Sequence, residues 1–406
     1  MAHPSFLLKS AIGIIILAAI YPYIFARLQV LSLFFANRPE RITEIRTWTD
    51  HSVKFRDRIR NCEDGLIVEE DGIAILSCDA GRDLYNTVMG TFASDLSSIP
   101  PGELLLYRYH HSAGRLSGSS EELTPIKLLD FPGGKEFHPL GVEYHRPSST
   151  LFVCNHHYDG SRLEIFSLDL DSSTTQPVAK HTRTIISPFL RSPNAIAALS
   201  DHELYVSNDH YYLARENPWL AKVETYAGIP WGALVYVNLS AGDSDSDSSP
   251  SVRPVAHVPF ANGVTLLNAS TLAVASTSTS SVRLYNIQPD RSLREFCVIN
   301  VPFMPDNLST DKRGTLLIAG HPHPPSLEKV IKSRNKCINN DARNLGNCLI
   351  GASPSWVAEW TLDSGLKNVY VTKREFGSST TAMRDVDRGV GIITGLYEKG
   401  IIFWRE

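Results

Sequence analysis

The chain has 406 residues, and 43% of them are apolar, which is enough to form a packed globular body. Many short apolar runs separated by turn residues, with few helical patterns, favour an all-β fold. The formal net charge is −4, and the chain has no basic run. This charge pattern excludes the electrostatic footprint of a nucleic-acid-binding protein.

The amino-terminal segment differs from the rest of the chain. Its seventeen residues 10–26 carry no charge, and after Arg27 residues 28–36 are again largely apolar. Such a run is at the lower limit for crossing a bilayer, and no small-x-small cleavage site follows it. We therefore expect residues 1–37 to be an uncleaved signal anchor and residues 38–60 to be a charged connector. Lys9 precedes the uncharged run, and Arg27, Arg38 and Arg41 follow it, so the positive-inside rule does not itself favour a lumenal body.

The remaining chain contains an internal repeat. Six times, a short apolar strand signal is followed by a turn or loop and a second strand signal. A repeat of about 40 to 50 residues is typical of four-stranded propeller blades. We therefore predict a six-bladed β-propeller over residues 61–406. The paired ranges are 72–77 with 104–109, 150–155 with 163–169, 203–208 with 233–238, 271–277 with 282–287, 315–321 with 356–362, and 389–397 with 401–404.

Oxygen-bearing side chains recur at one register of this repeat. Equivalent positions of a radial repeat converge on one axis, so we expect these side chains to form a single site. Asn307 directly follows one of the positions and adds a further oxygen. The positions nine residues before the first strand of each pair are Glu63, Gly141, Asn194, Asn262, Asp306 and Thr380.

The ligand types in this set favour calcium. Calcium accepts six to eight oxygen ligands in irregular geometry, whereas zinc prefers His or Cys and magnesium prefers a tight octahedron. The predicted ligands are Glu63, Asn194, Asn262, Asp306 and Asn307. Such an ion could polarise a substrate carbonyl or phosphoryl oxygen, or it could only hold the blades together. Ligand types alone do not decide between these two roles.

Three histidines follow strands at related positions of the repeat, namely His156, His210 and His321. Histidine is the usual general base near neutral pH, although a single histidine is more often structural. Their common position predicts a functional rim near the metal.

Cysteines and glycosylation motifs bear on the compartment. Cys337 and Cys348 flank a polar insert and could form a disulfide in an oxidising compartment, or remain two unpaired thiols. We expect the other four cysteines, Cys62, Cys78, Cys154 and Cys297, to be small buried residues. Asn238 and Asn268 are candidate glycosylation sites. Asn307 also matches the motif but is a poor candidate if it faces a metal.

A set of short segments in a fixed order resembles the paraoxonase/arylesterase family of calcium-dependent six-bladed propellers. The resemblance extends from about residue 60 to the end of the chain. Each segment is short, and only together are they specific. They are Glu63 with Asp64, residues 137–142 (FHPLGV), Asn155 with His156, Pro193 with Asn194, residues 207–211 (SNDHY), residues 260–263 (FANG), Asp306 with Asn307, and residues 320–322 (GHP).

The resemblance implies roles for individual residues. The five predicted ligands match those of the family's catalytic calcium, and Asp64 with the carbonyl of Val142 matches part of a second, structural calcium site. His156 matches one member of the family's proposed histidine dyad, and His210 and His321 match pocket residues. The family also keeps an uncleaved hydrophobic amino terminus, which favours a membrane-anchored protein with a lumenal or extracellular body.

Three departures from the family pattern matter. The first histidine of the dyad falls on Leu140, which leaves His156, His210 or a carboxylate such as Asp306 as candidate bases. An aspartate expected at the second calcium falls on Ala195, so that site is weakened or lost. Residues 401–406 contain no cysteine, so the family's disulfide to the last strand is missing and closure of the ring must depend on strand pairing.

These observations predict a calcium-dependent hydrolase of lactones and of aryl or carboxylic esters, with phosphotriesters as a further substrate class. One alternative is another propeller enzyme of the gluconolactonase or strictosidine-synthase type; the oxygen ligands argue against the synthase, which works without a metal. A second alternative is a non-enzymatic propeller whose calcium is structural and whose faces bind a protein or lipid.

Overall fold

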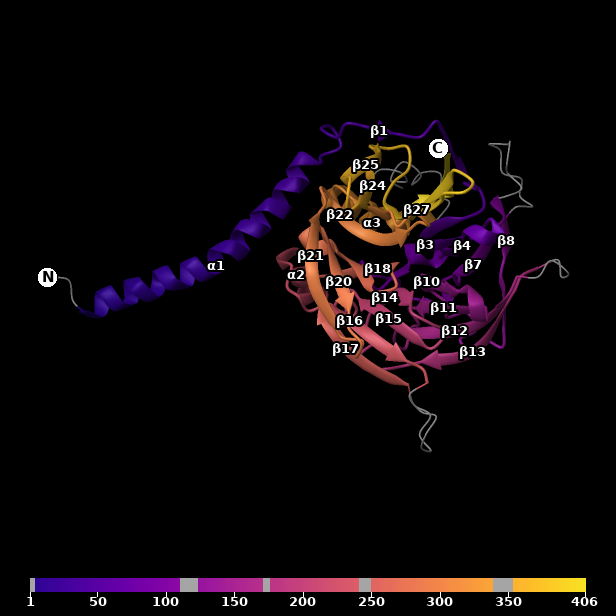
Figure 1. The fold of residues 1–406 in the computed structure, drawn as a ribbon, viewed down its shortest axis with the longest axis horizontal. Helices are drawn as coiled ribbons and strands as arrows, with labels where there is room; N and C mark the ends of the chain where they lie inside the picture. The colour runs from indigo at the N-terminus through magenta and orange to yellow at the C-terminus, as the bar shows by residue number, and fades with distance from the viewer. Residues whose placement is uncertain (1–3, 110–122, 171–175, 241–249, 339–352) are drawn as a thin grey trace.

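The structure is a computed structural model that describes residues 4–109, 123–170, 176–240, 250–338 and 353–406 (Figure 1). Side chains are described for these residues except 4–17 and 335–338. The body is a propeller-like ring of β-sheets, which confirms the all-β prediction at this level (Figure 1).

Three antiparallel four-stranded runs make up one side of the ring. The first of them gains a parallel edge strand, β9 (Lys127–Leu129), beside β13. The first run is β10 (Pro139–His145), β11 (Thr150–Asn155), β12 (Arg162–Asp169) and β13 (Val178–Ile185) with that edge strand; the next is β14 (Pro193–Ala198), β15 (Glu203–Asn208), β16 (Ala233–Asn238) and β17 (Ser251–His257); the third is β18 (Ala261–Asn268), β19 (Thr271–Ser276), β20 (Ser281–Ile287) and β21 (Leu293–Asn300).

The rest of the ring is a five-stranded sheet and an eight-stranded sheet. In the larger sheet, β26 pairs with β27, and β27 also pairs with β3. The five-stranded sheet is β22 (Met304–Thr310), β23 (Leu316–His321), β24 (Ser355–Thr361), β25 (Gly365–Thr372) and β1 (Ile45–Arg46); the larger sheet is β26 (Ser379–Asp385), β27 (Val390–Lys399), β28 (Ile401–Arg405), β2 (Asp50–Lys54), β3 (Arg60–Val68), β4 (Ile73–Cys78), β7 (Glu103–Tyr107) and β8 (Leu123–Pro125).

All six strand pairs predicted from the repeat are present as adjacent antiparallel strands. Their bounds differ from the predicted ranges by a few residues at most. The pairs are β4 with β7, β11 with β12, β15 with β16, β19 with β20, β23 with β24, and β27 with β28.

Strand pairing also joins the two ends of the body. Strand β2 pairs with the last strand, β28, from Asp50 opposite Arg405 to Lys54 opposite Ile401. Strand β1 pairs with β25 in the same way. Backbone hydrogen bonds between the first and last parts of the body therefore close the ring.

Apolar side chains fill the space between neighbouring sheets. Leu163 and Val235, for example, come from different sheets and belong to one fully buried cluster. Leu140, at the position of the missing dyad histidine, is buried in the same cluster. Its side chain therefore contributes to packing between sheets, where a charged or polar side chain would be costly.

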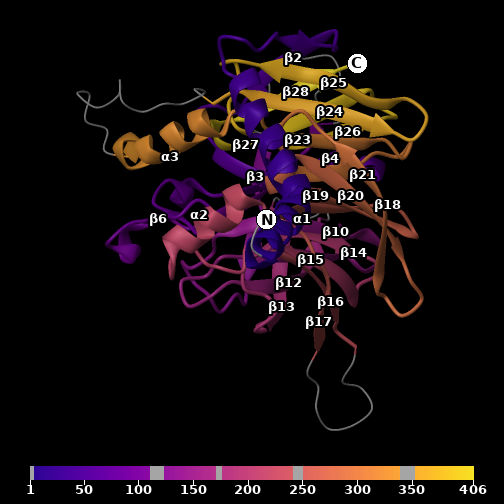
Figure 2. The same ribbon diagram turned by 90° about the vertical axis from the view of Figure 1, so that its left-hand side faces the viewer.

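Two helices and a short hairpin lie on the same side of the ring (Figure 2). Helix α2 (Pro218–Ala227) begins after Asn217, whose side chain accepts a hydrogen bond from the Leu220 amide, and ends at Gly228 with a φ of 63°. Proline at the first helical position is an ordinary start signal of a helix, and a left-handed glycine after the last position is an ordinary stop signal. The other two elements are helix α3 (Pro324–Ile338) and the hairpin β5 (Tyr85–Asn86) with β6 (Thr91–Phe92).

The amino-terminal helix α1 (Pro4–Ala36) projects from the ring, and only its last part contacts the body (Figure 1). The Arg27 guanidinium donates to the Ser278 carbonyl at 2.7 Å, and the Asn37 amide donates to the Pro302 carbonyl at 2.6 Å. No helix within the described part of the chain has both the length and the hydropathy to span a membrane. The predicted anchor falls partly on residues 1–17, whose side chains lie outside the described residues, and it is not confirmed.

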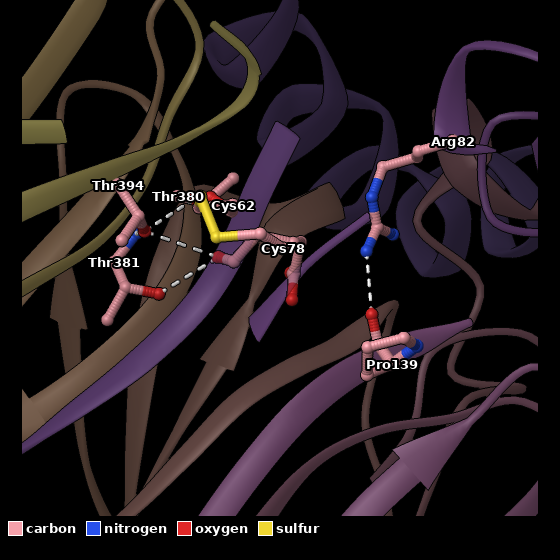
Figure 3. The surroundings of a disulfide bond; sticks show 8 residues. Cys62, Cys78, Arg82, Pro139, Thr380, Thr381 and Thr394 are labelled. Atoms are coloured by element: carbon pink, nitrogen blue, oxygen red, sulfur yellow. Dashed lines mark hydrogen bonds between the residues drawn. A yellow bond between two sulfur atoms is a disulfide. The ribbon is translucent and has the colours of Figure 1, made fainter. Parts of the chain in front are cut away.

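A disulfide joins Cys62 on β3 to Cys78 on β4 (Figure 3). The prediction that these two cysteines are merely small buried residues is wrong, because the strand register puts them directly opposite each other. Cys154 and Cys297 are free, the first buried and the second half-buried. The predicted Cys337–Cys348 pair lies outside the described residues.

The disulfide generates a first prediction. Replacing both Cys62 and Cys78 by serine should lower the free energy of unfolding by about 3 kcal/mol, because a bond across 16 residues restricts the unfolded chain. Urea unfolding measures this difference, with Cys297→Ser as the control for losing a thiol outside the bond. Equal unfolding midpoints for the double variant and the control would contradict it.

Candidate functional site

Six strands contact one another in a closed cycle around the centre of the ring, in the order β3, β10, β14, β18, β22, β26 and back to β3. Each of the six has a register shift against its outer neighbour. A bulge of this kind leaves residues unpaired and re-aims their side chains. The shifts contain Glu63, Gly141, Asn194, Asn262, Asp306 and Thr380, the six positions that the repeat identified.

The bulges bring all five predicted ligands into a buried cluster. Their exposed fractions lie between 2% and 5%. Four of them have a buried side-chain oxygen without a hydrogen-bond partner: Glu63 Oε2, Asn194 Oδ1, Asn262 Oδ1 and Asn307 Oδ1. Buried polar atoms are rarely left unsatisfied, so four such oxygens in one cluster indicate a missing partner.

Hydrogen bonds fix the orientation of the three amides. The nitrogen of Asn194 donates to Asp209 at 3.3 Å, that of Asn262 to the Thr277 hydroxyl at 3.1 Å, and that of Asn307 to Glu63 Oε1 at 3.0 Å. With each nitrogen used in this way, each amide oxygen remains available. An acceptor-only set of this kind suits a hard cation.

The electrostatics of the cluster support the same interpretation. Loss of hydration, together with the nearby Asp306 and Asp64 carboxylates, raises the pKa of Glu63 well above its ordinary value. The Arg82 guanidinium opposes this rise, and it donates to the Pro139 carbonyl at 2.7 Å (Figure 3). Several buried carboxylates with so little compensation favour a bound cation.

Two glycines allow the inner strands to approach at the site. A Cβ atom at Gly263 would lie 2.5 Å from the Cα of Asn307, and one at Gly141 would lie 2.2 Å from the carbonyl oxygen of Asn194. Both distances are far below a normal contact, so only glycine permits these backbones to pack beside the ligands. Gly141 thus occupies a repeat position without supplying a ligand.

Thr380 and Thr381 in the sixth bulge stabilise the strand that carries Glu63. The Thr381 hydroxyl lies 3.1 Å from the Glu63 carbonyl oxygen and 2.9 Å from Asp64 Oδ1, and the Thr380 hydroxyl lies 3.4 Å from the Cys62 carbonyl oxygen (Figure 3). Thr380 is one of the six repeat positions but is not among the predicted ligands.

The residues matched to a second calcium site are arranged differently. The Val142 amide donates to Asp64 Oδ2 at 3.0 Å, and Thr381 approaches the other oxygen of Asp64. Both carboxylate oxygens of Asp64 therefore already have partners, and residue 195 is an alanine. A second calcium at these residues stays a prediction.

The three histidines differ in their contacts. His210 has partners on both ring nitrogens, Asp209 at 2.7 Å and the Thr225 hydroxyl at 2.7 Å. His321 Nε2 lies 2.7 Å from Asp306 Oδ2, and its Nδ1 is buried without a partner. His156 Nε2 lies 2.8 Å from the Pro193 carbonyl, and its Nδ1 is paired with the Thr87 hydroxyl.

Two cavities flank the cluster on the side covered by the helices. The apolar cavity, of about 380 Å³, is lined by Asn262, Asp306 and His321 and by apolar residues that include Phe260, Leu327 and Ile331. The polar cavity, of about 390 Å³, is lined by residues that include Thr87, Tyr158, Asp209, His210 and Arg215. Val88, in the β5–β6 hairpin, lines both cavities.

The sequence motifs for glycosylation differ in exposure. Asn268 is exposed and Asn238 is half-buried, whereas Asn307 is buried against Glu63. Glycosylation of Asn238 and Asn268 stays a prediction, and the burial of Asn307 argues against its modification.

Two curated proteins are similar to this chain in sequence. Serum paraoxonase/arylesterase 1 of Mus musculus is 28% identical over 230 residues, which are 55% of this chain and 58% of that protein. Serum paraoxonase/arylesterase 2 of Bos taurus is 27% identical over 238 residues, which are 53% and 62% of the two chains. The chain thus covers less than two thirds of the length of these curated relatives.

Solved structures show a similar fold at low identity. A putative gluconolactonase aligns with a TM-score of 0.50 and 13% identity, covering 89% of this chain and 97% of that one. A luciferin-regenerating enzyme aligns with a TM-score of 0.50 and 11% identity, covering 88% and 95%.

A family model described as Arylesterase matches residues 115–337, which is more than half of the chain. The chain therefore belongs to the arylesterase family.

Proposed function

We propose that this protein is a calcium-dependent hydrolase of lactones and of aryl or carboxylic esters. The observation that carries the proposal is the cluster of unpartnered buried oxygens beside an apolar cavity. Membership of the arylesterase family supports the reaction class.

We infer that the ring has six blades. The eight-stranded sheet can be divided into two four-stranded runs, one from β3 to β8 and one from β26 through β28 to β2, joined only by the pairing of β27 with β3. The closed cycle of six inner strands supports this division. Each blade then contributes one bulge to the central site.

The residues present fit a calcium ion. Glu63, Asn194, Asn262, Asp306 and Asn307 would hold it, and backbone or water oxygens would complete the coordination. When bound, calcium supplies a Lewis acid for a carbonyl oxygen and stabilises the negative charge that develops on it. By the same contacts it would neutralise the buried carboxylates and hold the inner strands together.

The chain's own residues position the substrate. The apolar cavity would bind the hydrocarbon part of an ester or lactone, because Phe260, Leu327 and Ile331 line it beside Asp306. The same apolar lining would keep water away from the substrate, except beside the proposed metal ligands Asn262 and Asp306. A phosphotriester would fit the same chemistry, but an apolar wall favours uncharged carboxylic esters.

We further propose a lumenal or extracellular location. The Cys62–Cys78 disulfide supports it, since such bonds persist in oxidising compartments. Attachment to a membrane through residues 1–37 stays part of this proposal.

A non-enzymatic propeller with a structural calcium is the second candidate. It is favoured by Leu140, a residue buried in the core at the position where the family has a dyad histidine. The two candidates differ in one measurement. The enzyme should hydrolyse substrates only with calcium, whereas the binding protein should lose only thermal stability when calcium is removed.

Calcium removal gives the second prediction. Hydrolysis of phenyl acetate and a small lactone panel by the full chain should stop after chelation and return when calcium is added. Calcium at about 100 times its Kd should stabilise the fold by about 2.7 kcal/mol.

Asn262→Ala should weaken calcium binding, measured by calorimetry, and abolish calcium-dependent turnover. Asn268→Ala, an exposed asparagine on the same strand, is the control. Turnover that survives chelation would contradict the proposal.

The apolar cavity gives the third prediction. Ile331→Trp should fill part of it and lower kcat/KM for esters with long acyl chains by about 10-fold or more. The loss of contacts to one or two methylene groups in an apolar pocket lowers kcat/KM by about this factor. Acetate esters should be affected far less. Ile331→Leu, which keeps the volume, serves as the control. An equal effect on long and short esters would show that this cavity does not bind the acyl chain.

A further inference from the structure

The Thr87 hydroxyl connects His156 to the polar cavity. His156 itself is buried and does not line either cavity, whereas Thr87 is half-buried and lines the polar one. Thr87 Oγ1 is hydrogen-bonded to His156 Nδ1. Contact between His156 and a molecule in that cavity would therefore pass through this hydroxyl.

The direction of this hydrogen bond follows from the partner of the other nitrogen of the His156 imidazole. His156 Nε2 lies 2.8 Å from the carbonyl oxygen of Pro193, which can only accept. Nε2 therefore carries the proton, and in the neutral imidazole Nδ1 has the lone pair. Thr87 must donate to it. Burial lowers the pKa of His156, which keeps the ring neutral near pH 7.

A hydroxyl that donates to an imidazole, with the imidazole held by a third group, is the arrangement found in activated nucleophiles and proton relays. Here the third group is a backbone carbonyl, and it belongs to the residue before the predicted ligand Asn194. The base is thus hydrogen-bonded to β14, the strand that carries Asn194. Asp209, which binds the Asn194 amide, also lines the polar cavity.

Neighbouring contacts hold Thr87 in place. The side chain of Asn86 donates to the Tyr397 hydroxyl at 2.9 Å and accepts from the Met89 amide at 2.9 Å. These bonds fix the turn of the β5–β6 hairpin on both sides of Thr87. A catalytic hydroxyl needs such support, because a small displacement of a reacting group costs much of its rate.

We propose that Thr87 and His156 form the proton relay of this site, with Thr87 as the catalytic residue that contacts the attacking water. The proposal rests on the hydrolase function proposed above. The water oxygen forms a bond to the carbonyl carbon while one of its protons passes to Thr87 Oγ1. The Thr87 proton passes at the same time to His156 Nδ1, and the resulting imidazolium keeps its Nε2 proton, which stays hydrogen-bonded to the Pro193 carbonyl. Return of the proton along the same path to the leaving alkoxide completes the cycle.

The relay takes over the role that Leu140 cannot perform. The Asp306–His321 pair is the competing base, because His321 Nδ1 is free of partners beside the apolar cavity. If His321 acted as the base, its protonated ring would pair with the Asp306 carboxylate, which is also a ligand of the proposed calcium. His156 is held by a neutral carbonyl that does not bind the metal, so its protonation does not compete with the metal for a ligand.

The fourth prediction compares Thr87→Val with Thr87→Ser in the full chain with calcium bound. The valine variant should lower kcat by about 10²–10³-fold with KM changed by less than about threefold, the size expected for general base catalysis. The serine variant should keep most of the activity, because it keeps the hydroxyl. His156→Gln should resemble the valine variant, and combining the two should add little, since both remove one relay.

Thr184→Val is the matched control. Thr184 lies on β13 with its hydroxyl 3.0 Å from His181, outside the site, and this variant should keep the wild-type kcat. Histidine ¹⁵N NMR of the unsubstituted protein should show His156 as the neutral ring with the proton on Nε2, and melting temperature and calcium affinity should be the same for Thr87→Val and Thr87→Ser.

The outcomes separate the two proposals. If the unsubstituted protein hydrolyses no substrate with calcium, the proposed function fails and the relay with it. If it hydrolyses esters and Thr87→Val keeps wild-type kcat, only the relay is wrong. Loss of turnover in His321→Gln but not in Thr87→Val would assign the base to the Asp306–His321 pair. A proton on His156 Nδ1 would also overturn the relay.

Discussion

The structure depends on a group of oxygen atoms at the centre of the ring that have no partner of their own. Glu63 and Asp306 are buried acidic side chains beside three buried asparagines, and Glu63 and each asparagine have a side-chain oxygen without a hydrogen-bond partner. Burying unpaired carboxylates is costly, and neutralising them by protonation would remove their ability to bind a cation. A divalent ion would resolve both problems, and the proposed central site would then be linked to the stability of the six inner strands.

The inner strands create this group by a local device. A regular strand would turn alternate side chains into the packing between sheets, but each bulge leaves one or two positions unpaired. Gly141 and Gly263 then let neighbouring backbones approach where a Cβ would clash. The site therefore comes from the backbone geometry of separate strands, each of which also packs an apolar face in the ring.

The same periodicity explains why much of the site could be predicted from sequence. Because a strand has a fixed rise per residue, each bulge lies at a constant number of residues before the next strand. This spacing was enough to predict Glu63, Asn194, Asn262 and Asp306. The Cys62–Cys78 bond could not follow, because it requires the register of two strands. Helices α2 and α3 were also missed, although Pro218 and Pro324 are typical helix starts. Thr87 lies in a two-strand hairpin too short to give any pattern.

The substitution at position 140 changes how the site can handle a proton. A histidine there would have to point out of the packing between two sheets, whereas Leu140 contributes to that packing. His156, the other dyad position, does not line the polar cavity and needs a group that does. The β5–β6 hairpin supplies this group because Asn86 and Met89 hold Thr87 between His156 and the polar cavity. A packing residue in the sheet and a hydroxyl in a hairpin are thus two parts of one arrangement, in which core stability and access to the base come from different elements.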